Sequence, residues 1–217
     1  MTVARKILVG LVGENDNDTA ALTALLLPRF GDGVQFVRLG RRITGDQLAN
    51  KNDKARKVLE ADFAKANVQL VVVSRDLDAL AADAKKVAAR QQEFEHFNQH
   101  AFGGCGLLLL HIYELEALIA AEPTEFNRRY NVAYKPKGNV MHLERPKDKL
   151  KSVTGHRYHE AHAALLLEKA DYDALLARCG YFAAFDGDFS ARLAVPRPHD
   201  RARAAKRASG GGRHGST

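Results

Sequence analysis

Four short apolar runs, separated by stretches with helical patterning, constrain the fold of this chain more than any other feature. The runs are bounded by Gly, Asn or Asp and cover residues 6–12, 34–39, 68–74 and 106–112. Helical patterns lie between them at residues 18–30, 53–66 and 77–97, with Asn52 or Asp53 as a plausible cap of the second. Since helical crossovers join parallel strands, we predict an α/β fold with a doubly wound, mostly parallel sheet that is covered on both faces.

The rest of the chain divides by composition. Residues 1–134 form the predicted α/β domain, residues 135–194 a basic link with a helical C-terminal extension, and residues 195–217 a basic tail. The tail has almost no large apolar residue, so we predict that it is disordered. Of the net charge of +7, most lies in residues 192–217, which hold seven basic residues and one acid. The part predicted to fold is therefore nearly neutral, although a basic tail adds salt-sensitive attraction to phosphate backbones.

Cysteine usage and hydropathy indicate the compartment. Cys105 and Cys179 lie far apart, and the chain has no signal-like N-terminus and no apolar run of about 18 residues. We expect a cytoplasmic protein with reduced cysteines and no membrane contact. Walker-type and Gly-x-Ser-x-Gly motifs are absent from the sequence.

Acidic residues follow two of the predicted strands. Glu14, Asp16 and Asp18 come after the first apolar run, and Asp76 and Asp78 come after the third. Ligands bind open parallel sheets beyond the carboxyl ends of the strands, and extended residues two apart share a face, roughly 6 to 7 Å from each other. If the first and third strands are neighbours, the carboxylates converge. Such a cluster of oxygens suits Mg²⁺ or Mn²⁺.

A structural explanation of the same acids stays open. Asp after a strand often caps the next helix, so Asp18 and Asp78 would then begin the helices that follow. Asp16 is better explained as a solvated loop residue than as a ligand. A phosphoacceptor signalling domain also gathers acids at strand ends, but no lone acceptor Asp and no Lys after a fifth strand stand out here.

The order and spacing of Glu14, Asp18, Asp76 and Asp78 resemble the TOPRIM domain of topoisomerases, primases and OLD-type nucleases. The fourth apolar run continues into Tyr-Glu-Leu-Glu-Ala-Leu at residues 113–118. This segment and the Lys-rich residues 146–160 are similar to a small TOPRIM-related family of bacterial proteins, and the resemblance covers residues 5–190. The chain departs from the TOPRIM pattern at Asn15, where Gly usually follows the first Glu.

The resemblance implies a Mg²⁺-dependent nuclease, or nuclease subunit, that acts on DNA or RNA, with phage defence or a mobile element as the expected setting. Asp76 and Asp78 would hold the metal, with Asp18 as a further ligand, and Glu14 would act as general base or ligand. Glu114 is preferred over Glu116 as an added ligand because it is nearer the strand end. The alternative is a non-catalytic TOPRIM module that works with a separate ATPase or another partner.

Two further groups carry weaker predictions. His156, His159 and His162 stand three apart on a predicted helix, which gives a zinc site little support. Basic residues between positions 135 and 157 form either a solvated link or a guide for a phosphate backbone beside the acids.

Overall fold

The four predicted strands form one parallel sheet. The computed structural model of the protein describes residues 6–194, and in it the strand order is β2-β1-β3-β4, with every pairing parallel. The strands are β1 (Ile7–Val12), β2 (Val34–Arg38), β3 (Leu70–Asp76) and β4 (Gly106–His111). The predicted α/β class is confirmed, and the first and third strands are neighbours, which was the condition for the acids to converge.

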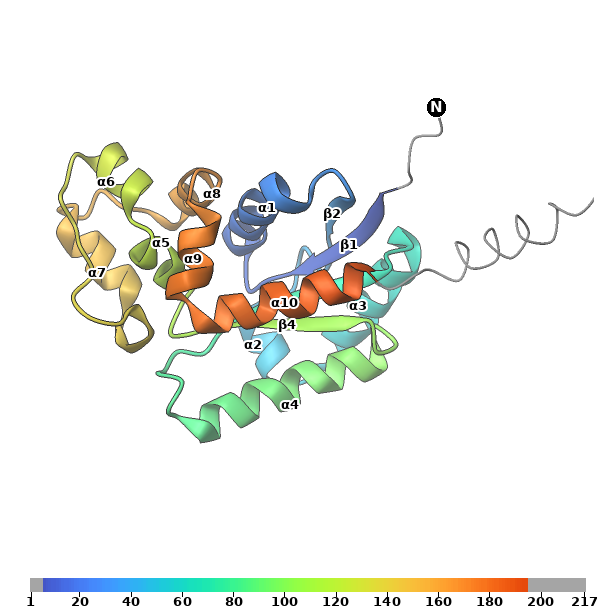
Figure 1. Ribbon diagram of the computed structural model, residues 1–217. Coiled ribbons are helices and arrows are strands. Elements are labelled where there is room, and N and C mark those ends of the chain that lie inside the picture. The colour runs from blue at the N-terminus through green and yellow to red at the C-terminus, as the bar shows by residue number, and fades with distance from the viewer. Residues whose placement is uncertain (1–5, 195–217) are drawn as a thin grey trace, which may run out of the picture.

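Helices cover both faces of the sheet (Figure 1). The helices in the connections between strands are α1 (Asp16–Phe30), α2 (Gly45–Ala49), α3 (Asp53–Ala66) and α4 (Ala84–His100). Their start signals are local: the Asn52 side chain accepts hydrogen bonds from two N–H groups of the first turn of α3, as the sequence predicted. α1 lies on one face of the sheet, whereas α2, α3 and α4 lie on the other.

The chain after β4 is mostly helical. Its elements are α5 (Glu116–Ala121), α6 (Thr124–Tyr130), α7 (Pro146–Val153), α8 (Ala163–Leu167), α9 (Tyr172–Arg178) and α10 (Gly180–Ala194), with short 3-10 turns η1 (Val140–His142) and η2 (Glu160–His162). α10 packs along β4, and α8 packs against α1 (Figure 1).

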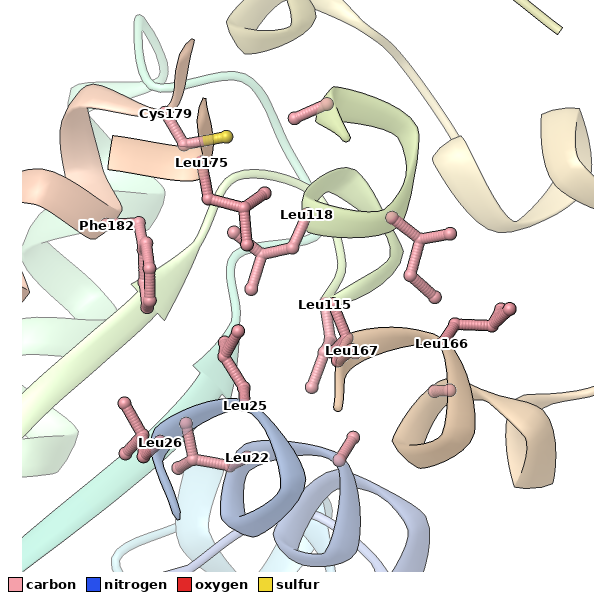
Figure 2. Close-up of a cluster of buried hydrophobic side chains, with 14 of the residues drawn as sticks. Leu22, Leu25, Leu26, Leu115, Leu118, Leu166, Leu167, Leu175, Cys179 and Phe182 are labelled. Atoms are coloured by element: carbon pink, nitrogen blue, oxygen red, sulfur yellow. The ribbon is translucent and has the colours of Figure 1, made fainter. Parts of the chain in front are cut away.

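The C-terminal helices share their core with the sheet. Figure 2 shows Leu22 and Leu25 of α1 facing Leu118 of α5 and Phe182 of α10, and one apolar cluster joins these side chains to Val9, Leu11 and Val72 of the sheet. Residues on both sides of position 135 therefore contribute to the same core. Burial of this cluster is the main driving force that holds α5–α10 on the sheet.

Two helical predictions were wrong in part. Residues 77–83 form turns rather than the start of a helix, because α4 begins at Ala84 with the Asp83 side chain as its cap. Residues 156–159 are not helical either, since His156 adopts a left-handed conformation with φ of 63°. The predicted disorder of the tail lies outside the described residues. Within residues 6–194, no helix has the length and apolar character needed to cross a bilayer.

Candidate functional site: an acidic cluster at the switch point of the sheet

The carboxyl ends of β1 and β3 form the point where the direction of winding reverses. β1 leads into α1 on one face of the sheet, and β3 leads into α4 on the opposite face. The two strands pair directly, with Val12 opposite Val73. The two following helices diverge to opposite faces, and the carboxyl ends of strands at such a switch point are where open α/β sheets bind ligands. Glu14 and Asp76 lie at this point.

Glu14 bridges the two strand ends. Its Oε1 accepts a hydrogen bond of 3.3 Å from the backbone N–H of Asp76 and lies 3.4 Å from Nε of Arg75. Gly45, at the start of α2, approaches the same carboxylate so closely that an added Cβ would lie 2.5 Å from Oε2 of Glu14. The Glu14 carboxylate is therefore held between β3 and α2.

Asp18 serves the helix and the cluster together. Its Oδ2 accepts hydrogen bonds from the backbone N–H groups of Glu14 and Asn15, while the Asn15 side chain caps α1. Asn15 is thus the N-cap residue, and Asp18 completes the capping box. Burial, assisted by the charge of Glu14, raises the pKa of Asp18 to about 6. The capping explanation holds for Asp18 and does not exclude a ligand role.

Asp76 is an acid of the cluster whose pKa is raised. Burial first, and then the charges of Glu14 and Asp18, raise its pKa well above the ordinary value of an aspartate. Its Oδ1 accepts a hydrogen bond of 3.0 Å from the backbone N–H of Leu115. Two of the predicted ligands, Asp18 and Asp76, are therefore close enough to the third, Glu14, for its charge to raise their pKa values.

The segment after β4 contributes Glu116 rather than Glu114 to this electrostatic cluster. Glu116 is buried, its charge adds to the raised pKa of Asp76, and burial raises its own pKa to about 7 against the opposing charge of Lys147. Glu114 instead accepts a hydrogen bond of 3.0 Å from the backbone N–H of Lys147 in the first turn of α7. The sequence analysis preferred Glu114 over Glu116 as the added acid, whereas in the structure Glu116 is the one that joins the cluster.

Asp78 lies apart from the cluster. Its backbone is left-handed, with φ of 55°, and its side chain is 57% exposed and forms an ion pair of 3.0 Å with Arg90 of α4. It does not cap α4, because Asp83 does. The reversal of the chain at positions 77–79 explains why Asp78 does not share a side with Asp76, since the two-residue rule holds only for extended backbone.

Asp16 is the first residue of α1 and not a loop residue. Its exposed side chain forms an ion pair with Arg38 at the end of β2, and the hydrogen bond from Arg38 lowers its pKa. It takes no part in the cluster, in agreement with its low rank in the sequence analysis.

The sequence analysis missed a group of charged residues beside the acids. The Arg75 side chain is 4% exposed and donates a 2.9 Å hydrogen bond to the Gly45 carbonyl, with Glu93 of α4 at 3.3 Å. Arg90 donates to the Asp76 carbonyl and pairs with Glu93. The only sequence signal for this network was the i,i+3 spacing of Arg90 and Glu93, which is common on ordinary helix surfaces. Burial lowers the pKa of Arg75, although Glu14 opposes the effect.

The three histidines do not gather. His162 hydrogen-bonds through Nδ1 to the hydroxyl of Tyr130 at 2.6 Å, and His159 packs its ring edge-on against that of His162. His156 lies in a turn. In the Lys-rich segment, Lys147 is committed to an ion pair with Glu160 at 3.2 Å. These contacts give His159, His162 and Lys147 structural roles.

The cluster fits a divalent cation in its chemistry. Glu14, Asp18 and Asp76 offer hard oxygen donors, and burial, followed by the charge of Glu14, raises the pKa values of Asp18 and Asp76. As the side chains lie, however, each carboxylate accepts a backbone N–H, and within residues 6–194 no three His, Cys, Asp or Glu side chains are placed to hold a metal ion together. Binding would require these side chains to turn from the N–H groups towards a common ion.

Comparison with known proteins adds no assignment. No protein-family model matches the chain, and neither a curated protein nor a solved structure matches it.

Proposed function

We propose that the protein is a TOPRIM-like, Mg²⁺- or Mn²⁺-dependent nuclease, or the nuclease subunit of a larger system, that acts on the phosphodiesters of DNA or RNA. One observation carries the proposal: Glu14, Asp18 and Asp76 gather at the switch point of a parallel sheet, where the pKa values of Asp18 and Asp76 are raised. Their order and spacing also resemble the TOPRIM motif. A site of this kind is stabilised by a cation, and its usual substrate is a phosphate ester.

Under this proposal, different residues of the site would have different roles in cleavage. Glu14, Asp18 and Asp76 would hold the ion, which when bound supplies Lewis-acid stabilisation of the phosphodiester's negative charge. Glu14 is also the candidate general base, because it reaches both strand ends and lies 3.4 Å from Nε of Arg75. Arg90 fixes the strand end through the Asp76 carbonyl and holds Asp78 at the edge of the site.

The buried guanidinium of Arg75 favours a second candidate function. It places a positive charge against Glu14 and Glu93 inside the protein, so part of the acidic charge is balanced without a metal. A non-catalytic TOPRIM-like module that binds a partner, such as a separate ATPase, would have this arrangement. Under this alternative the acids and arginines form a structural ion-pair network.

Metal binding tests both candidates. A cation that binds only the folded state raises the melting temperature with the logarithm of its concentration. We expect millimolar Mg²⁺ or Mn²⁺ to stabilise the wild type relative to EDTA and to have little effect on Asp76→Asn. Equal melting curves in metal and EDTA, together with no heat of binding by calorimetry, would support the structural network.

Cleavage tests the catalytic assignment. Plasmid DNA and a structured RNA are incubated with the wild type, Asp76→Asn and Glu14→Gln in Mn²⁺ or EDTA. Asp46→Asn serves as the matched control, since it makes the same change at an exposed acid of α2. We expect the first two variants to lose cleavage and the control to retain it. Equal cleavage by Asp76→Asn and the wild type would place the active site elsewhere. Absence of cleavage by any of the proteins, with or without an ATPase encoded next to it, would favour the binding module.

A further inference from the structure

A basic pocket lies beside the acidic cluster. It has a volume of about 660 Å³ and opens between the end of β2, the loop that follows, α2 and α3. Its basic lining residues are Arg38, Arg41, Arg42, Lys54 and Lys65. Among the lining residues the only acid is Asp62, whose Oδ2 already accepts a 2.9 Å hydrogen bond from the N–H of Gly40. The pocket therefore has a positive charge, although the described part of the chain as a whole is close to neutral.

The cations are only partly engaged with the protein. Arg38 pairs with Asp16 and contacts the Arg41 carbonyl, but its Nε is buried without a hydrogen-bond partner in the described part of the chain. A buried donor of this kind normally finds a partner, in the protein or in a ligand. Arg41, Arg42 and Lys54 are exposed at the opening. Such a set of donors suits phosphate oxygens.

The inner wall of the pocket is apolar. Leu39, Ile43 and Ala55 are buried and line it from the loop and α3, while Val58, on the same side of α3, remains 37% exposed. Inorganic phosphate would use only the charged opening. A ligand with a phosphate at one end and a less polar body at the other would use both parts.

We propose that this pocket binds a nucleotide unit, with its phosphate at the arginines and lysines and its sugar and base against Leu39, Ile43 and Val58. The volume falls in the range of small-ligand sites, roughly 300 to 1,000 Å³. The unit is either a free nucleotide or one nucleotide of a bound strand, and both present the same chemistry.

The pocket is next to the acids along the chain and in space. Ile43 lines the pocket, and Gly45, two residues later, touches the Glu14 carboxylate and accepts a hydrogen bond from Arg75. Two residues span at most about 7 Å, which is close to the length of one nucleotide step in an extended strand. The strand form of the inference rests on the proposed function: a strand held in the pocket would bring a neighbouring phosphodiester towards Glu14 and Asp76.

Fluorescence-anisotropy binding of a labelled five-nucleotide oligothymidine tests the proposal, with AMP, UMP and inorganic phosphate as competitors, in EDTA and 150 mM salt. The double variant Arg42→Glu/Lys54→Glu should weaken binding at least tenfold, since charge-assisted hydrogen bonds to phosphate are lost. Lys57→Glu is the matched control, because Lys57 is an exposed lysine of the same helix that does not line the pocket. It should bind within about twofold of the wild type, because salt screens a charge beyond roughly 8 Å.

The competitors identify the ligand. A nucleotide unit is supported if AMP or UMP competes at least tenfold more strongly than inorganic phosphate and if Val58→Asn reduces this competition. If the oligonucleotide binds more tightly than the free nucleotides, the unit is assigned to a strand. Three results would overturn the proposal. They are equal competition by phosphate and AMP, an equal loss of binding in the double variant and in Lys57→Glu, and no binding by the wild type.

Asp76→Asn separates the two proposals. If it and the wild type bind the oligonucleotide equally and neither cleaves, the nuclease proposal fails and the pocket stands. If the wild type cleaves and the pocket variant has an unchanged KM, the nuclease proposal stands and the strand form of the pocket proposal fails.

Discussion

Replacing Asp18 by Asn is expected to stabilise the metal-free protein at neutral pH, although the change alters a helix cap. The Asp18 carboxylate is destabilised by burial and by the charge of Glu14, and its pKa in the folded state is about 6. Asn keeps an oxygen that can accept hydrogen bonds from the N–H groups of Glu14 and Asn15. The variant therefore retains most of the cap and loses the unfavourable charge.

The sign and size follow from linkage. An acid whose pKa is higher in the folded state binds more protons when folded, so the wild type loses stability as pH rises between the two pKa values. With pKa values of 3.8 unfolded and about 6 folded, the loss relative to a neutral side chain is about 1 kcal/mol at pH 4.5 and about 3 kcal/mol at pH 8. Solvent screening at the half-buried side chain reduces both values. The advantage of the variant should therefore grow by about 1 to 2 kcal/mol between these pH values.

The measurement is urea unfolding of both proteins in EDTA at several pH values from 4.5 to 8. Asp16→Asn is a control of opposite sign, because the hydrogen bond from Arg38 lowers the pKa of Asp16. This control should be less stable than the wild type by a nearly constant amount from pH 8 to pH 4.5, because stability from a lowered aspartate pKa is lost only below the ordinary value of 3.8. If Asp18→Asn is instead less stable than the wild type by about 1 kcal/mol at every pH, the residue is a cap alone and the electrostatic argument is wrong.

Two more predictions concern the fold and the position of Glu14. Gly45→Ala places a Cβ 2.5 Å from Oε2 of Glu14 and should displace this flexible carboxylate. Mn²⁺-dependent cleavage should therefore fall by roughly 10- to 100-fold, while the melting temperature stays close to that of the wild type. Unchanged cleavage would contradict a role for the position of this carboxylate. Leu22→Ala empties a fully buried position of the core and should lower the free energy of unfolding by about 2 to 5 kcal/mol, whereas Leu27→Ala, on the same helix but 49% exposed, should change it by less than about 1 kcal/mol. Equal losses in urea unfolding of the two leucine variants would refute this placement of the core.

The architecture was predictable because its signals are local. Each strand was marked by an apolar run with its own boundaries, and each crossover by a helical pattern of sufficient length. Parallel pairing follows from such crossovers, and with it the meeting of Glu14 and Asp76 at the carboxyl edge of the sheet. The cap at Asn52 was predictable for the same reason, since the capping bonds span three residues.

The charge arrangement was decided by the tertiary structure. Asp78 pairs with Arg90, twelve residues away on the next helix, and Glu116 is buried against the hydroxyl of Tyr158, 42 residues away. Spacing from the strand end favoured Glu114, but the packing of α5 and α7 turns Glu116 inward. Such choices depend on which distant side chains supply hydrogen bonds and opposite charges, which no local pattern records.

The sequence by itself therefore determined the sheet, its covering helices and the edge at which the acids gather, because periodicity and crossover length act along the chain. Only the tertiary structure decided which carboxylates lie close enough to interact electrostatically and how deeply Arg75 is buried beside Glu14. It also decided that Arg42 and Lys54 line one pocket. The physical reason is that the apolar pattern acts through local backbone geometry, whereas burial and Coulomb interactions depend on distances between segments that only folding brings together.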